Sequence, residues 1–203
     1  MTTPLPRERW LLGLLLLGVV AWWLALPEPF HLPNNDYYSF ERAARSLAAF
    51  ELPASFKRMP ILPLLMAGLA PFLSEPHATL KAALIWNQVF SLGVLVGLFV
   101  LGRRAFGRPG LLLPLLFAAT TQFHANGLQP LVEPSLGFFV VWAFVLQERG
   151  SPWQYAAAFG AALSRYEAAL VIPVLWLAEV VRERRLWWPV AKACLASSGL
   201  LLW

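Results

Sequence analysis

Residues 82–102 read AALIWNQVFSLGVLVGLFVLG, a run of 21 residues without a charged side chain. Lys81 precedes this run and Arg103 follows it. A helix that crosses a bilayer needs roughly 17 to 25 mostly apolar residues, so the run has the length of one crossing. A second uncharged run, residues 109–132, has 24 residues. We therefore predict a helical protein that is embedded in a membrane.

The composition of the whole chain agrees with this prediction. Of its 203 residues, 59% are apolar and 13% are charged, whereas ordinary soluble domains carry roughly 25% charged residues. This excludes a soluble globular domain and an intrinsically disordered chain. The net charge is +5, but the basic residues form short clusters between apolar runs. Because no basic stripe follows a helix face, we expect no nucleic-acid partner.

The basic clusters predict the orientation of the chain. Cytoplasmic loops of membrane proteins are enriched in Lys and Arg, so the clusters at residues 7–9, 103–108 and 182–185 are expected inside. The predicted fold class is an all-α, polytopic transmembrane helical bundle that forms one module over residues 1–203. The expected spans are residues 10–26, 79–101, 110–123, 131–147, 154–164, 168–181 and 186–203.

Two segments are expected at the external face without crossing the membrane. The run at residues 60–73 is short, and a full crossing there would place Arg103 and its neighbours outside. We therefore predict a re-entrant segment or short helix. Residues 37–47, in the first external loop, have apolar and polar faces at helical spacing and predict a juxtamembrane helix on the outer membrane surface.

Three further expectations concern the limits of the spans. A cleaved signal peptide is the rival interpretation of residues 10–26. Two short helices that meet at residues 164–167 would keep Arg165 and Glu167 near the outer face. The chain is still apolar at Trp203, so we expect the N-terminal part of a longer protein.

Ionisable residues in or beside a membrane are costly, and they are therefore functional candidates. The expected topology brings Asp36, Lys57, Arg58, Glu133 and Arg165 to the external side. Arginine binds a phosphate group through two parallel donors, and a carboxylate can accept a proton from a hydroxyl. The pattern is typical of a site that binds an anionic group and activates a hydroxyl.

Each candidate also has a structural interpretation. Asp36 is placed to cap a helix, and Glu133 to satisfy a helix N-terminus. Lys57 and Arg58 would serve as an interfacial anchor. Arg165 would form an ion pair with its near neighbour Glu167.

Four stretches around these residues carry a resemblance to a known family. They are Asn34-Asn35-Asp36-Tyr37-Tyr38, Lys57-Arg58-Met59-Pro60-Ile61-Leu62-Pro63, Glu133-Pro134-Ser135 and Gly160-Ala161-Ala162-Leu163-Ser164-Arg165-Tyr166-Glu167-Ala168. In their order and spacing they resemble the integral-membrane glycosyltransferases of the GT-C fold, which include the dolichyl-phosphate-mannose protein mannosyltransferases and the lipid A aminoarabinose transferases. The resemblance covers nearly the whole chain, as the N-terminal half of such an enzyme.

The resemblance implies transfer of a sugar, with inversion, from a polyprenyl-phosphate donor to a hydroxyl or amine of a lipid, glycan or protein acceptor. The reaction would occur on the external or periplasmic face of a cell membrane. Asp36 would be the general base, and Arg58 and Arg165 would neutralise the phosphate. Glu133 would orient the acceptor or hold a divalent metal ion. The remaining expected substrate-binding residues are Lys57, Tyr37 and Glu167.

The chain departs from the family pattern in its acidic motifs. It has no Asp-Glu pair after the first span and no Asp-x-Asp, so metal dependence stays open, with Asp36 and Glu133 as the candidate ligands. The alternative function is a non-enzymatic polytopic membrane protein, either a transporter or a scaffold subunit. Transporters tend to carry charges near the bilayer midplane. The charges here collect at one face, which favours the enzyme.

Overall fold

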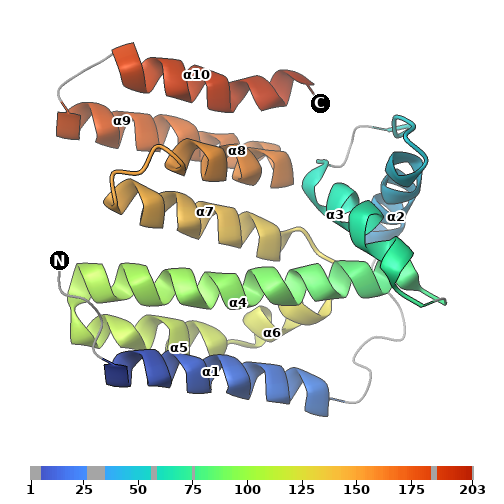
Figure 1. Ribbon diagram of the computed structural model, residues 1–203, viewed down its shortest axis with the longest axis horizontal. Helices are drawn as coiled ribbons and strands as arrows, with labels where there is room; N and C mark the ends of the chain where they lie inside the picture. Colours follow the sequence, from blue (N-terminus) through green and yellow to red (C-terminus); the bar gives the residue numbers. More distant parts are fainter. Residues whose placement is uncertain (1–5, 27–34, 56–58, 75, 184–186, 203) are drawn as a thin grey trace.

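The computed structural model describes residues 6–26, 35–55, 59–74, 76–183 and 187–202, and every regular element in these ranges is a helix (Figure 1). The all-α fold class is therefore confirmed. Three 3-10 helices adjoin the α-helices: η1 (Ala70–Phe72), η2 (Arg108–Leu111) and η3 (Tyr166–Leu170). The α-helices are α1 (Pro6–Ala25), α2 (Asn35–Ala48), α3 (Ile61–Leu69), α4 (Ala78–Phe106), α5 (Leu112–Ala118), α6 (Thr121–Leu128), α7 (Glu133–Glu148), α8 (Gln154–Ser164), α9 (Val171–Glu183) and α10 (Trp187–Leu202).

Most of the helices lie alongside one another, while α2 and α3 lie across one end (Figure 1). Helix α1 starts at the other end, and α4, α7 and α9, which run parallel to one another, end there. We call this the basic end, because it carries Arg7, Arg103, Arg149 and Arg182. The opposite end is called the α2–α3 end. The basic clusters therefore lie at one end of the bundle, as the expected topology requires.

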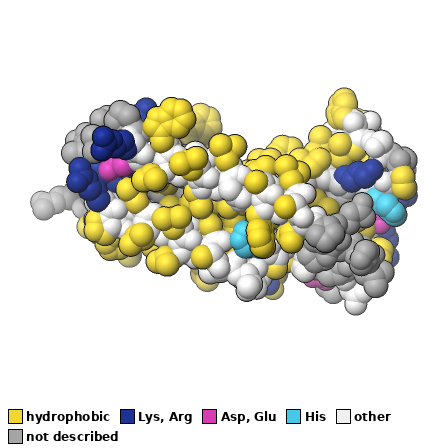
Figure 2. Space-filling view, turned by 90° about the horizontal axis from the view of Figure 1, so that it is seen from below, with side chains coloured by type: hydrophobic (Ala, Val, Ile, Leu, Met, Phe, Trp, Pro, Cys, Tyr) yellow, Lys and Arg dark blue, Asp and Glu magenta, His cyan; other side chains and the backbone are white. Residues whose placement is uncertain are grey.

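The surface between the two ends is mainly apolar on the face seen in Figure 2, and Lys and Arg side chains gather at the basic end. Large apolar side chains are exposed along the helices, for example Leu14 and Leu17 on α1 and Leu116 on α5. Such a contiguous exposed apolar surface is typical of contact with a membrane rather than with water.

Two helices are long and apolar enough to cross a membrane, namely α1 from Arg7 to Ala25 and α4. A third crossing exists if α6 and α7, which are bent by 113° relative to each other, count as one span. The other expected spans coincide with shorter helices, and their crossing of a membrane stays a prediction.

The span expected at residues 110–123 is not one continuous helix. Helix α5 ends at Ala118, and α6 begins at Thr121. The break has a local cause, because Thr120 has extended backbone angles and its hydroxyl accepts a hydrogen bond from the Phe123 amide at 3.2 Å. A threonine that caps a helix in this way starts a new helix instead of continuing the old one.

The two non-crossing segments of the expected topology are present as helices. Helix α3 and η1 together form a short apolar helix that lies at the α2–α3 end rather than along the bundle (Figure 1). Helix α2 presents Tyr37, Phe40 and Ala44 to Leu62 and Met66 of α3, and all five side chains are buried. The expected helix at residues 37–47 is thus confirmed, and it starts slightly earlier.

The interior is built around a close approach of α4 and α7. A Cβ atom added to Gly97 would lie 2.3 Å from Cγ1 of Val141, and one added to Gly93 would lie 2.5 Å from the Phe138 ring. The Trp142 indole of α7 also reaches α4 here and donates to the Gly93 carbonyl at 3.1 Å. Glycine at these two positions therefore sets the distance between the two helices.

Helix α1 is part of the packed interior. Val19 and Trp23 are each 5% exposed and join a cluster with Leu95 of α4. At the basic end, the Arg103 guanidinium forms an ion pair with the buried Glu8 carboxylate at 3.1 Å. These contacts join α1 to the bundle, and its retention in place of cleavage as a signal peptide stays a prediction.

The orientation of the bundle can be tested with single cysteines at exposed positions. In a Cys194→Ala background, which removes the native cysteine, Ala49→Cys places a thiol at the α2–α3 end and Ala105→Cys at the basic end. A membrane-impermeant thiol reagent applied to intact cells is expected to label position 49 only, since basic clusters stay inside. Permeabilised cells should show both labels. Exclusive labelling of position 105 in intact cells would reverse the orientation.

The close approach of α4 and α7 predicts that Gly97→Ala lowers the free energy of unfolding by about 1–3 kcal/mol, since Val141 is stiff and must move. The matched control is Gly13→Ala in α1, where an added Cβ meets nothing within 4 Å. That change should be neutral or stabilising by up to about 1 kcal/mol. Thermal unfolding in detergent compares the two variants. Equal melting temperatures would contradict the tight α4–α7 contact.

Candidate functional site

Three of the expected site residues meet at the α2–α3 end. Arg165 Nη1 lies 3.4 Å from Glu133 Oε1, and Arg165 Nε lies 3.4 Å from Glu167 Oε2. Glu133 is the first residue of α7, whereas Arg165 follows the end of α8 and Glu167 lies in η3. We call these three residues the Glu133–Arg165–Glu167 cluster. It joins positions that are 32 residues apart in the sequence.

The backbone places Arg165 in this cluster through a break between two helices. Helix α8 ends at Ser164, whose hydroxyl donates to the Gly160 carbonyl at 2.9 Å. Arg165 itself is extended, with φ −155° and ψ 127°, and η3 starts at the next residue. The helix break expected at residues 164–167 is therefore present, and it turns the Arg165 side chain toward the start of α7.

An open pocket of about 450 Å³ begins at the cluster and follows α7 and the start of α9. Beyond the charged residues, its lining is apolar and includes Leu136, Val140 and Val171. A ligand with a charged group and a hydrocarbon chain matches this combination of walls.

The ion pairs within the cluster are weak. The three side chains are between 40% and 49% exposed, and exposed ion pairs typically contribute only about 0–1 kcal/mol. A charge-assisted hydrogen bond between arginine and a phosphate contributes about 1.5–3 kcal/mol. Arg165 can therefore exchange a carboxylate partner for an anionic ligand at little loss of stability.

One carboxylate oxygen of Glu133 accepts no hydrogen bond from the described residues. Its Oε2 atom is buried and has no hydrogen-bond partner among the described residues. Leaving a buried acceptor unsatisfied costs about 1–3 kcal/mol. A ligand hydroxyl that donates to this oxygen would remove that cost, and the role of Glu133 in orienting an acceptor stays a prediction.

The structure places Asp36 and Tyr37 in the first turn of α2, at the same end as the cluster but in a different environment. Asp36 is exposed, and its main-chain carbonyl accepts from Ser39 Oγ at 2.8 Å. Tyr37 is 4% exposed and packs in the α2–α3 interior. Val132, the residue before Glu133, packs against the same apolar group and links the two regions.

The Tyr37 hydroxyl belongs to a polar chain. It lies 2.9 Å from Thr79 Oγ1, and Thr79 donates to Glu41 Oε1 at 3.1 Å. Because Thr79 uses its proton on Glu41, its oxygen accepts from Tyr37. Burial raises the pKa of Tyr37 above its ordinary value of 10.0, so the phenol stays a neutral donor. This arrangement fixes α2 against the start of α4, and any contact of Tyr37 with a substrate stays a prediction.

The remaining two candidates, Lys57 and Arg58, lie outside the described residues. Their shared binding of phosphate with Arg165 stays a prediction.

The donor atoms do not fit a divalent metal ion held by the protein. Among the described residues, no three His, Cys, Asp or Glu side chains form a group that could hold a metal ion. Glu133 Oε1 is engaged by the Arg165 guanidinium, whose positive charge disfavours a cation beside it. We therefore derive no step through a metal ion.

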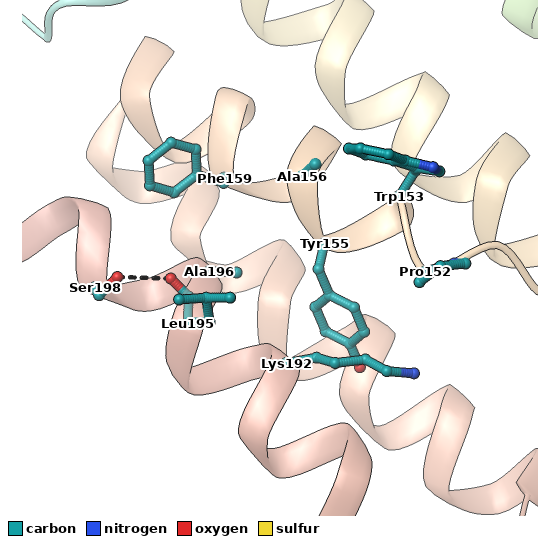
Figure 3. A pocket seen from close by; sticks show the side chains of 9 residues that line it. All are labelled: Pro152, Trp153, Tyr155, Ala156, Phe159, Lys192, Leu195, Ala196 and Ser198. Atoms are coloured by element: carbon teal, nitrogen blue, oxygen red, sulfur yellow. Dashed lines mark hydrogen bonds between the residues drawn. The ribbon is translucent and has the colours of Figure 1, made fainter.

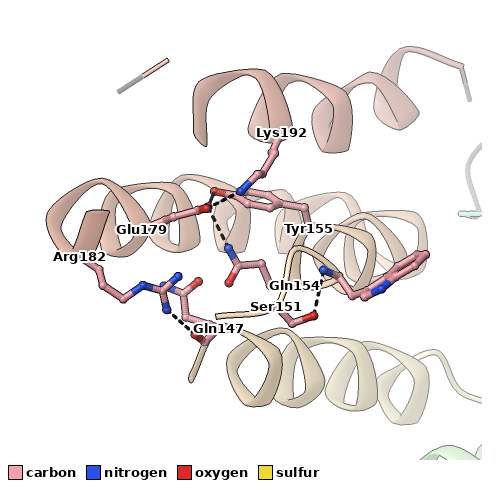
Figure 4. A network of polar contacts seen from close by, with 8 residues as sticks. Gln147, Ser151, Gln154, Tyr155, Glu179, Arg182 and Lys192 are labelled. Atoms are coloured by element: carbon pink, nitrogen blue, oxygen red, sulfur yellow. Dashed lines mark hydrogen bonds and ion pairs between the residues drawn. The ribbon is translucent and has the colours of Figure 1, made fainter. Parts of the chain in front are cut away.

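A second polar cluster, absent from the sequence-based expectations, lies inside the bundle near the basic end (Figure 4). Glu179 of α9 is 1% exposed. Lys192 Nζ of α10 donates to its Oε1 at 2.6 Å. The Tyr155 hydroxyl and Gln154 Nε2, both on α8, donate to its Oε2 at 2.7 and 3.0 Å. We call these four residues the Glu179 network, and it connects three helices.

The sequence contains a signal for this network. Glu179 lies within the expected span 168–181, and Lys192 lies within the expected span 186–203. A charge inside a span is a functional candidate in its own right. What the sequence does not contain is the pairing, which arises because α9 and α10 pack against each other.

No family model, curated protein or solved structure matches the chain. The resemblance to GT-C glycosyltransferases accordingly stays a prediction, and the function is argued below from the residues themselves.

The Glu179 network predicts that a single substitution destabilises the protein more than a double substitution does. Lys192→Met leaves the Glu179 carboxylate buried without its cation, and the free energy of unfolding should fall by about 3–5 kcal/mol. The double change Glu179→Gln with Lys192→Met removes both charges and should recover most of that loss. Unfolding in detergent, followed by circular dichroism, measures the difference.

The control is Glu148→Gln, which removes the charge of a 60% exposed carboxylate that lies 3.9 Å from Arg104. It should change the free energy of unfolding by at most about 1 kcal/mol. A Lys192→Met variant no less stable than this control would show that the buried pair does not stabilise the bundle.

Proposed function

We propose that the chain is the membrane-embedded part of a glycosyltransferase, which moves a sugar from a polyprenyl-phosphate carrier to an acceptor. One observation carries the proposal: Arg165 and Glu133 line the same open pocket, and the rest of its lining is mainly apolar. A guanidinium suits a phosphate, a carboxylate suits sugar or acceptor hydroxyls, and apolar walls suit a polyprenyl chain.

In the proposed arrangement the bundle is a polytopic membrane module with its basic end in the cytoplasm. The positive-inside rule supports this placement, because Arg103, Arg104, Arg149 and Arg182 all lie at the basic end. The Glu133–Arg165–Glu167 cluster then lies at the external or periplasmic face. Asp36 is on the same side, in the juxtamembrane helix α2.

The proposed reaction is a single displacement. The acceptor oxygen or nitrogen attacks the anomeric carbon of the sugar while the bond from this carbon to the phosphate oxygen breaks. The carboxylate of Asp36 takes the proton of the acceptor, and polyprenyl phosphate leaves. Because the attack comes from the side opposite the leaving phosphate, the anomeric configuration inverts. Arg165 stabilises the negative charge that grows on the phosphate, usually the largest catalytic contribution.

The acids beside Arg165 have a defined place in this proposal. Glu133 accepts a hydrogen bond from a hydroxyl of the acceptor or the sugar through its unsatisfied Oε2. Glu167 holds the guanidinium in position before the donor binds. Lys57 and Arg58, which follow α2 in the chain, supply the further positive charge that a phosphate between two carboxylates requires.

The proposal is tested by incubating the purified full chain with radiolabelled polyprenyl-phosphate sugars and an acceptor-containing membrane extract. Arg165→Gln should weaken donor binding by about 10- to 100-fold, the equivalent of one charge-assisted hydrogen bond. Asp36→Asn should lower the transfer rate by about 10²- to 10⁴-fold while donor binding stays unchanged, because the amide cannot accept the proton.

The matched control is Glu148→Gln, which removes the 60% exposed carboxylate beside Arg104 at the basic end and should alter neither quantity. The alternative function, a transporter or scaffold subunit without enzymatic activity, is favoured by the carboxylates that already surround Arg165. Absence of label transfer by the wild-type chain, together with unchanged donor binding in Arg165→Gln, would decide for that alternative and return Arg165 to a structural role.

A further inference from the structure

A groove lies between α8 and α10, at the opposite side of the bundle from α1 (Figure 1). Its volume is about 510 Å³, and it is open to the exterior. Figure 3 shows Ala156 and Phe159 of α8 on one wall and Leu195 and Ala196 of α10 on the other. The walls are almost entirely apolar, so the part of a ligand that fills them is a hydrocarbon.

One charged side chain lines the groove. Lys192 lies on α10 beside Tyr155, and its side chain is 20% exposed. An ammonium group has three N–H donors, and the hydrogen bond to Glu179 Oε1 uses one of them. Its nitrogen also lies 5.9 Å from the Tyr155 ring and 5.8 Å from the Trp188 ring. Two N–H donors therefore remain for an anionic group at this edge of the groove.

The electrostatic surroundings favour an anion there. Glu179 balances Lys192, while Arg182, one turn further along α9, adds a positive charge that acts on the same carboxylate. Arg149 lies at the same end of the bundle, in the connection after α7. Arg182 donates to the Gln147 carbonyl of α7 at 2.8 Å and does not line the groove. Lys192 is thus the cation at the groove, and an ammonium group beside apolar walls is complementary to an anionic lipid, which carries its phosphate next to its acyl chains.

We propose that this groove binds one acyl chain of an anionic phospholipid whose phosphate accepts hydrogen bonds from Lys192. The proposal rests on the membrane placement above and not on the transferase activity. In a bilayer a void along a helix pair loses van der Waals contacts, so a lipid chain fills it. Lipid chains resemble one another, so the headgroup contact with Lys192 determines which lipid is retained.

Trp153 indicates which edge of the groove lies at the level of the lipid headgroups. It lies at the start of α8, lines the groove and is 70% exposed. Trp188, on the first turn of α10, is 66% exposed. Tryptophan prefers the level of the lipid headgroups, so these two rings place the Lys192 edge of the groove near the headgroups of the cytoplasmic leaflet.

The test uses the full chain in detergent and native mass spectrometry with two lipids of identical acyl chains, phosphatidylglycerol and phosphatidylcholine. The wild-type chain is expected to retain phosphatidylglycerol with about a tenfold preference. Ala156→Trp fills the groove and should abolish the retention of both lipids. The matched control, Ala21→Trp, introduces the same ring at an exposed position of α1, on the opposite side of the bundle, and should retain both preference and affinity.

A second variant tests the headgroup contact separately from the contact with the acyl chain. The double change Glu179→Gln with Lys192→Met removes the cation without leaving a buried charge, and it should bind the two lipids equally. Equal retention of both lipids by the wild-type chain would overturn the proposal. So would unchanged phosphatidylglycerol binding in Ala156→Trp, or a wild-type dimer that Ala156→Trp converts to a monomer, which would assign the groove to a second copy of the chain. None of these outcomes depends on sugar transfer, so the proposed function is tested separately.

Discussion

The close contact between α4 and α7 determines the positions of the other helices. Gly93 and Gly97 remove the side chains that would separate the two helices, and the Trp142 indole donates to the Gly93 carbonyl between them. Helix α4 packs against α1, α3, α5 and α6, whereas α7 packs against α8 and α9. A change in the α4–α7 distance would therefore move two sets of helices relative to each other, including the α2–α3 end against the start of α7.

The charged side chains at the two ends of the bundle differ in burial and in their hydrogen bonding. At the α2–α3 end, Glu133, Arg165 and Glu167 are half-exposed and held by weak ion pairs, so they can change partners. Near the basic end, the buried Glu179 carboxylate accepts hydrogen bonds from Lys192 and from the neutral side chains of Tyr155 and Gln154. The first arrangement suits binding and release of a charged ligand. The second is suited to holding helices in one register, since a buried charge without its partner is strongly destabilising.

Local patterns in the sequence were sufficient for several elements. The uncharged run at residues 82–102 predicts α4, and helical spacing at residues 37–47 predicts α2. The break near Arg165 followed from the need to keep charges out of an apolar run. One local signal was missed: Thr120 splits a predicted span because its hydroxyl caps α6, and the polar run Thr120-Thr121-Gln122 is a helix start in the sequence itself. Features that depend on packing were missed as well. The contacts of Arg165 with Glu133, and of Glu179 with Lys192, join residues on separate helices, so neither can be read from spacing along the chain. Asp36 was predicted from a loop motif, and its role still depends on that motif.

The Glu179–Lys192 pair has a consequence for biosynthesis. The two residues are 13 positions apart, and Glu179 leaves the ribosome first. At a synthesis rate of about 5–20 residues per second, the acid precedes its cation by roughly one second. In the proposed membrane arrangement, α9 would enter the bilayer with an unpaired carboxyl group near its cytoplasmic end, which is unfavourable. Tyr155 and Gln154 are translated earlier, on α8, and both donate to this carboxylate. A nascent α8–α9 hairpin can thus hold Glu179 until α10 arrives, which makes the order of donors along the chain part of the insertion pathway.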